Sequence, residues 1–215
     1  MEHQVTVNWL DGQLSTSLRE WQLDGQSQYE ERDVIVEPSV IKHLDYYFEK
    51  FTYYLSPFGV MDARFPLLAF SYGEGREVNS KLASLVLDAM GAYPTIKGIL
   101  QWEIADLVIE VNPLLADRII PIRLPENKDY MTTREVASKA LGHTTHRKAN
   151  LVAQLWHASR CIRQAQEQGW HIISLRGVNA FATHDPQSWV RHPLDWLIKE
   201  SRFRYIENHE NNEIA

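Results

Sequence analysis

Hydrophobic and polar residues alternate at the start of the chain and then recur at helical spacing. In the stretch VTVNWL, the side chains of Val5, Val7 and Trp9 share one face of an extended segment, which predicts a strand. A second short strand is expected over residues 33–37, where the apolar stretch VIV lies between acidic residues. After this strand, apolar and aromatic residues recur with helical spacing, so we expect a helix over residues 38–55.

The pattern in the middle of the chain predicts a buried strand, two helices and an edge strand. The apolar run RFPLLAFSYG at residues 64–73 indicates a buried strand, and residues 74–94 have the spacing of an amphipathic helix. A second helix is expected over residues 95–112, because a threonine that can cap it stands first and a proline follows it. Residues 118–125 predict a strand, and Pro121 within it favours a position at the edge of a sheet.

Residues 133–183 predict one compact unit of two helices and a hairpin. A short helix is expected over residues 133–141, ended by a glycine, and a longer one over residues 149–168 with a single apolar stripe. The stretch HIISLRGVNAFATH at residues 171–184 is expected to form two strands that turn at Arg176.

Charge is distributed unevenly along the chain, which has a net charge of −6. Residues 1–130 hold 11 Lys or Arg against 20 Asp or Glu, whereas residues 131–182 hold seven against two. A basic block inside an acidic protein points to an anionic partner. The alternative is that these cations belong to ordinary solvated helix faces.

Residues 133–183 resemble the DNA-binding output domain of the response-regulator (OmpR-like) winged-helix family. The resemblance lies in the helices REVASKALG and LVAQLWHASRCIRQ and in the final stretch HIISLRGVNAF. It implies a recognition helix that reads the major groove and a wing that contacts phosphates. The implied DNA-binding residues are Lys139, Arg147, Lys148, Asn150, His157, Arg160, Arg163 and Arg176.

The expected fold class is therefore α+β, with an acidic mixed α/β N-terminal region followed by a winged-helix-like C-terminal region. Residues 1–125 are expected to bind a protein partner or to form a homodimer, residues 126–205 to bind double-stranded DNA, and residues 206–215 to be a disordered tail. The function expected is that of a transcriptional or mobile-element regulator without a cofactor. A single cysteine, the lack of a signal peptide and the lack of a long apolar run favour the cytoplasm.

Other functional classes remain open on the sequence. An interaction subunit of a larger assembly would use the basic block to dock an acidic protein or RNA. A tyrosine recombinase is another alternative, because His157 and Arg160 have the H-x-x-R spacing of that family. Tyr205 lies downstream as a candidate nucleophile.

Three further sites are weaker alternatives. A zinc site would use His143, His146, His157 and Cys161. An acidic helix face is formed by Glu103, Asp106 and Glu110. The glycine-rich stretch at residues 71–80 precedes a helix, but it lacks the spacing of the known phosphate-binding loops.

Overall fold

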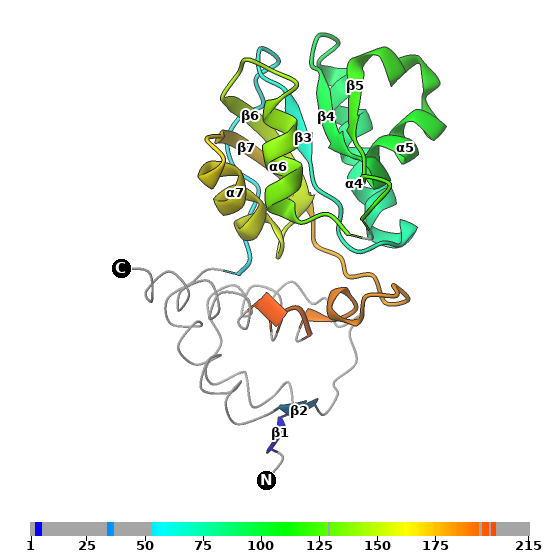
Figure 1. The fold of residues 1–215 in the computed structure, drawn as a ribbon, viewed down its shortest axis with the longest axis vertical. Helices are drawn as coiled ribbons and strands as arrows, with labels where there is room; N and C mark the ends of the chain where they lie inside the picture. Colours follow the sequence, from blue (N-terminus) through cyan, green and yellow to red (C-terminus); the bar gives the residue numbers. More distant parts are fainter. Residues whose placement is uncertain are drawn as a thin grey trace. The chain divides into compact units, whose positions relative to one another are not determined.

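The computed structural model describes residues 3–5, 34–36, 53–128, 130–193, 195–197 and 199–200, and Figure 1 shows their secondary structure. The chain divides into two compact units, one of Met1–Tyr54 with Gln187–Ala215 and the other of Leu55–Pro186. In the first unit β1 (His3–Val5) pairs antiparallel with β2 (Val34–Val36), and η2 (Ser188–Val190) is a short 3-10 helix.

Two expectations fall largely on residues that are not described. The tail at residues 206–215 lies outside the described residues, as does Tyr205. The helix expected over residues 38–55 also lies outside them, except for its last three positions, which are not helical.

The second unit is built on a sheet of five strands, and each strand runs parallel to its neighbours. The spatial order is β5-β4-β3-β6-β7. The strands are β3 (Leu67–Ala69), β4 (Gly98–Gln101), β5 (Ile119–Ile122), β6 (Lys148–Gln154) and β7 (His171–Val178). The chain therefore moves outward from β3 through β4 to β5, then returns to the other side of β3 for β6 and β7.

Each parallel connection contains a helix, as the long crossover between parallel strands requires. The helices are α4 (Arg76–Ala92), α5 (Trp102–Val111), α6 (Thr133–Leu141) and α7 (Ala158–Glu167), with the 3-10 helix η1 (Pro113–Arg118) before β5. Helix α4 packs with α5, and α6 packs with α7 (Figure 1). The unit is thus a doubly wound α/β sheet, and the domain boundary expected near residue 125 falls inside it, between β5 and α6.

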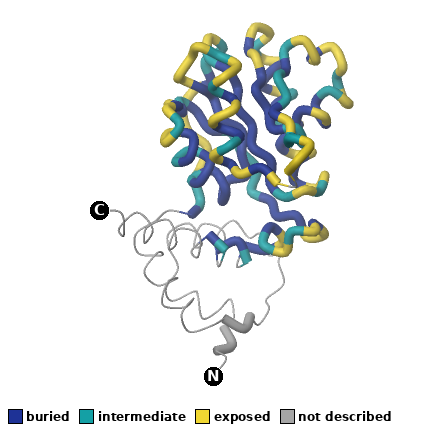
Figure 2. Tube along the Cα trace, viewed as in Figure 1, coloured by how far each residue is buried: buried dark blue, intermediate teal, exposed yellow. Residues whose placement is uncertain are grey.

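The inner strands are buried along almost their whole length because helices cover the sheet on both faces, and most of their residues are apolar. All residues of β3 and β4 are buried, as are the six residues of β6 after Lys148 (Figure 2). A strand buried on both faces does not alternate between apolar and polar residues. Its sequence therefore resembles the apolar part of a buried helix.

Two of the predicted helices begin too early in the sequence for this reason. Residues 98–101, expected to be helical, form β4, and the helix begins only at Trp102. Residues 148–154, expected to lie in a turn and the start of the longer helix, form β6, and α7 begins at Ala158. The predictions for α4, α6 and the edge strand β5 are confirmed, and Thr132 caps α6 through a capping box with Glu135.

The expected hairpin at residues 171–184 is also wrong. Residues 171–178 form the single strand β7, which runs parallel to β6 with Leu175 opposite Leu151. Residues 148–178 are thus a strand, a helix and a second strand, in place of a recognition helix and a wing. What the structure shows is a mixed α/β fold.

Arg176 and Gly177, where a turn was expected, lie within the edge strand β7. Their contacts account for an arginine and a glycine at these positions. The guanidinium of Arg176 donates to the backbone carbonyls of Phe58 and Gly59, each at 3.1 Å. At Gly177 an added Cβ would lie 2.4 Å from the carbonyl oxygen of Ala153, so only glycine allows this approach to β6.

Replacing Gly177 by alanine is expected to lower the free energy of unfolding by roughly 1–3 kcal/mol, because the methyl group would press on Ala153 and Leu155. Chemical denaturation followed by circular dichroism measures this change. Gly91→Ala in α4 is the matched control, since a Cβ there meets nothing within 4 Å. It is expected to raise stability by about 0.5–1 kcal/mol. Equal stability of the two variants would contradict the close packing of β7 on β6.

Candidate functional site

The residues expected to contact DNA lie at both ends of the sheet. Arg147 and Lys148 are exposed at the amino end of β6, whereas His157 and Arg160 follow its carboxyl end. Seven residues of extended strand separate the two groups by roughly 20 Å. The structure brings Arg147 and Lys148 together, and it does not bring them to Arg160.

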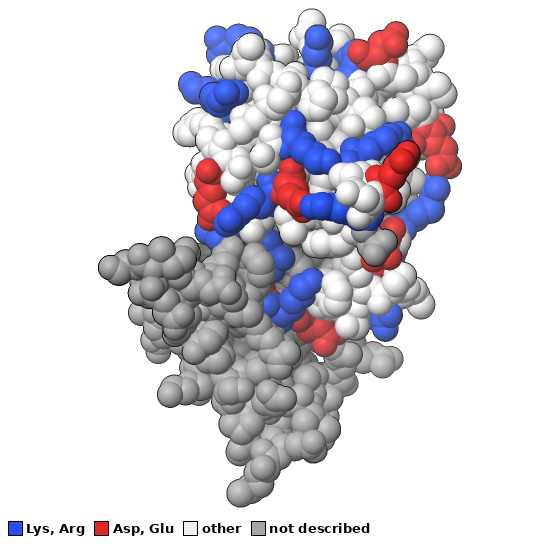
Figure 3. Space-filling model, viewed as in Figure 1, with Lys and Arg blue, Asp and Glu red and all other residues white. Residues whose placement is uncertain are grey.

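The other predicted residues have different surroundings. Asn150 is fully buried in β6, and Arg176 holds the backbone at residues 58–59. Lys139 is exposed on α6, and Arg163 forms an ion pair with Glu167 on α7 at 3.2 Å. On the face shown in Figure 3, Lys and Arg side chains lie among Asp and Glu side chains over the described part of the molecule.

The topology of the sheet points to a different place for a site. The chain leaves β3 toward one side and leaves β6 toward the other, so the connections that follow these two neighbouring strands diverge. In open parallel sheets the crevice outside the carboxyl ends of such strands is where ligands bind. We therefore examine the side chains that follow β3, β4 and β6, which we call the carboxyl-end crevice.

Three polar residues meet where β3 and β4 end. The backbone N–H of Ser71 donates to Oε1 of Gln101 at 3.1 Å, and Nε2 of Gln101 lies 3.4 Å from Oε1 of Glu103. Ser71 and Gln101 are buried, and Glu103 is half-buried in the first turn of α5. Among the described residues, Oε2 of Glu103 is buried and has no hydrogen-bond partner.

Burial raises the pKa of the Glu103 carboxyl to about 7, and the charge of Asp106 adds a smaller rise. Hydrogen bonds from its own backbone, from Ser71 and from Gln101 act in the opposite direction and are outweighed. A carboxyl group with this pKa is present in both its acid and its base form near neutral pH.

The opposite side of the crevice carries a buried histidine and a buried arginine. The backbone N–H of His157 donates to Oε1 of Gln154 at 2.8 Å, and Nε2 of its ring lies 3.3 Å from Oγ1 of Thr133. His157 and Arg160 are each 7% exposed. The ring of Tyr72, which follows β3, lies 5.9 Å from the His157 ring between centroids.

Tyr130 connects the two sides electrostatically. The residue as a whole is 55% exposed, yet burial around its phenol oxygen is sufficient to raise its pKa. The positive charge of Arg160 lowers this pKa and the negative charge of Glu103 raises it. The charges of Arg160 and Glu103 thus act on the same phenol, with opposite effects on its pKa.

The glycine-rich stretch after β3 is ordered by Asn79 of α4. Oδ1 of Asn79 accepts from the backbone N–H of Tyr72 at 2.9 Å, and its Nδ2 donates to the carbonyls of Gly73 and Gly75. The backbone N–H of Gly75, at the start of α4, donates to Oδ2 of the buried Asp185 at 2.6 Å. A carboxylate of the chain itself thus occupies the place where a phosphate would contact this helix end.

A pocket of about 160 Å³ opens between the first turns of α4 and α5. Glu103 lines it together with Trp102 and Asn79. The sequence grouped Glu103 with Asp106 and Glu110 as one acidic face. Asp106 pairs with Arg123 at 2.7 Å and Glu110 pairs with Arg76 at 2.9 Å, both on the surface. Glu103 differs from them in its position, two residues after the end of the buried strand β4.

The four candidate zinc ligands do not converge. His143 and His146 lie in the turn before β6, whereas His157 and Cys161 follow its carboxyl end. Within the described ranges, no group of three His, Cys, Asp or Glu side chains is arranged to hold a metal ion.

The chain matches no protein-family model, no curated protein and no solved structure. In the part that the structure describes, no helix combines the length and the apolar character needed to span a membrane. Neither finding assigns a function to the chain.

The raised pKa of Glu103 predicts a pH dependence of stability. The folded state retains the proton up to about pH 7, whereas the unfolded carboxyl loses it near pH 4.5, so wild-type stability falls as pH rises through this window. Glu103→Gln removes this loss. It is expected to gain up to about 3 kcal/mol over wild type between pH 4.5 and pH 8. Urea denaturation across this range measures it, with the exposed Asp88→Asn as control. Parallel pH profiles for wild type and Glu103→Gln would contradict the assignment.

Proposed function

We propose that the unit Leu55–Pro186 is an enzyme domain that binds a small anionic molecule in the carboxyl-end crevice and transfers a proton to or from it. Glu103 is the general acid–base group in this proposal. The observation that carries it is the buried Glu103 carboxyl with a pKa of about 7, placed beside the carboxyl ends of β3 and β4. Titratable groups with shifted pKa values in a cleft are candidates for catalysis.

Arg160 and His157 supply the recognition of the substrate in this proposal. A guanidinium binds a carboxylate or a phosphate through two parallel hydrogen bonds, and burial strengthens such contacts. Arg160 is buried, and its charge acts on the same phenol as that of Glu103. An anionic group held by Arg160 would therefore place the rest of a small substrate near Glu103.

A panel of small phosphate esters and hydroxy acids tests this function, with binding followed by thermal shift and conversion by proton NMR. We expect one class of anion to raise the melting temperature of both wild type and Glu103→Gln, and only the wild type to convert it at full rate. Loss of the acid–base group is expected to slow conversion by roughly 10²–10⁴-fold.

Asp88→Asn, which neutralises an exposed carboxylate on α4, is the control and should convert the substrate at the wild-type rate. Arg160→Lys keeps the charge and loses the two-point contact, so it should weaken binding. Full-rate conversion by Glu103→Gln would reject the proposal, as would unchanged binding by Arg160→Lys.

Binding of double-stranded DNA is the second candidate, and the observation that favours it is the exposed pair Arg147 and Lys148 at the amino end of β6. A homodimer or a protein partner bound through residues 1–125 remains part of this proposal. A regulator of this kind would contact the backbone phosphates through this pair. His157 and Arg160, at the other end of β6, would not share in the contact.

Fluorescence anisotropy with mixed-sequence duplexes tests the second candidate. We expect binding that falls steeply with salt and that Arg147→Ala weakens for every sequence. Arg160→Lys serves as the comparison and should leave DNA binding unchanged. Absent or salt-insensitive binding would remove DNA as a partner.

A further inference from the structure

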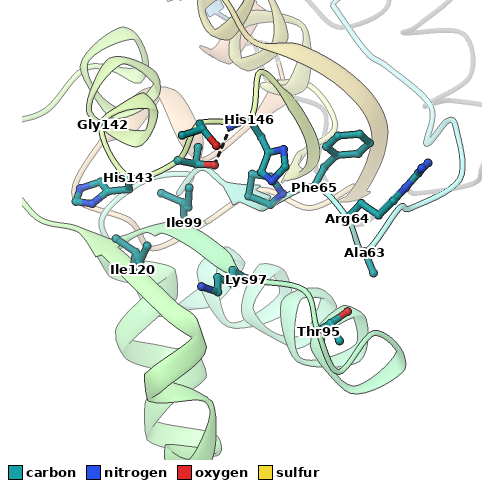
Figure 4. A pocket seen from close by; sticks show the side chains of 13 residues that line it. Ala63, Arg64, Phe65, Thr95, Lys97, Ile99, Ile120, Gly142, His143 and His146 are labelled. Atoms are coloured by element: carbon teal, nitrogen blue, oxygen red, sulfur yellow. Dashed lines mark hydrogen bonds between the residues drawn. The ribbon is translucent and has the colours of Figure 1, made fainter.

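A second and larger pocket lies at the amino end of the same sheet, away from the carboxyl-end crevice. Its volume is about 600 Å³, within the range of pockets that hold small ligands. Its walls come from the loop before β3, the turn before β4, the turn between α6 and β6, and one residue each of β4 and β5 (Figure 4).

The lining of this amino-end pocket joins hydrogen-bond donors to apolar walls. Lys97, His143 and His146 line it together with the hydroxyl groups of Thr144 and Thr145. Among the described residues no Asp or Glu lines it, and the ammonium of Lys97 has no ion-pair or hydrogen-bond partner among them. The donors therefore suit an anion.

The apolar part of the lining is formed by Phe65, Ile99 and Ile120 (Figure 4). The half-buried ring of Phe65 lies edge-on to His146 at 5.6 Å between centroids. Nζ of Lys148 lies 5.7 Å from the centre of the same ring, which keeps a second ammonium close to the pocket. A ligand that fills this lining needs both a flat apolar portion and an anionic group.

Asn150 fixes the loop that carries Phe65. Its Oδ1 accepts from the backbone N–H of Asp62 at 3.0 Å and from Oγ of Ser174 at 2.8 Å. Its Nδ2 donates to the carbonyls of Asp62 and Phe65. Because Asn150 is fully buried, these bonds are shielded from water and hold the wall of the pocket in place before a ligand arrives.

We infer that the amino-end pocket binds a nucleotide, with the phosphate at Lys97 and His143 and the base against Phe65 and Ile99. This site goes beyond the proposed acid–base function and does not depend on it. A free mononucleotide and the end of a single-stranded nucleic acid present the same chemistry to such a pocket.

Isothermal titration of the full chain with adenosine monophosphate, inorganic phosphate, adenosine and a short single-stranded oligonucleotide tests the inference. We expect the nucleotide or the oligonucleotide to bind, and phosphate and adenosine each to bind at least about tenfold more weakly. The double variant Lys97→Gln/His143→Gln should weaken nucleotide binding by about tenfold or more, since it removes two donors to the phosphate. Both residues are exposed, so the variant is expected to fold normally.

Lys81→Gln, which removes an exposed lysine of α4 outside this pocket, is the matched control and should bind as wild type does. Glu103→Gln should also bind the nucleotide normally, which separates this site from the carboxyl-end crevice. Tighter binding of the oligonucleotide than of the mononucleotide would assign the site to nucleic acid, and equal binding to free nucleotide. Binding of phosphate as tight as that of the nucleotide would overturn the inference, as would full binding by the double variant.

Discussion

The structure of the unit Leu55–Pro186 depends on one constraint: a parallel sheet must be covered by helices on both faces. The crossovers that join β3, β4, β5, β6 and β7 supply those helices, and the sheet interior is correspondingly apolar. Polar side chains from distant parts of the sequence can then meet at the two ends of the strands. The two candidate sites lie at these two ends, and each is formed by the residues of the segments that enter or leave the strands there.

The sequence predicted the elements with a periodic pattern and the buried strand β3, but it missed the strands β4 and β6, whose apolar residues fall within the helices expected there. The helix α4 has clear amphipathic spacing, and the proline in β5 marks an edge strand, so both were recovered. The segments GILQ and ANLVAQ are mostly apolar and do not alternate, so their pattern also fits the apolar part of a buried helix. The site was missed for the same reason: Glu103 looks like one of three helix carboxylates until the strand before it is known.

Two buried polar groups, Asn150 in β6 and Glu103 in the first turn of α5, differ in how fully they are hydrogen-bonded. The side-chain amide of Asn150 forms hydrogen bonds with the segment before β3 and with β7. Its burial therefore costs little free energy, and its hydrogen bonds hold these segments in place. Glu103 finds fewer partners, and its carboxyl holds a proton up to about pH 7. The amide of Asn150 thus holds neighbouring segments in place, whereas the carboxyl of Glu103 keeps an oxygen without a hydrogen-bond partner among the described residues.

The contacts of Arg176 also bear on how this protein behaves at high concentration. A parallel sheet that ends in a bare strand exposes unpaired N–H and C=O groups, to which another chain can add a strand. Here Phe58 exchanges backbone hydrogen bonds with Leu175, and the Arg176 guanidinium fastens the same segment over the outer side of β7. At the opposite margin the proline of β5 offers no N–H at its position. Both edges of the sheet therefore offer fewer free backbone groups to which a strand from another molecule could add.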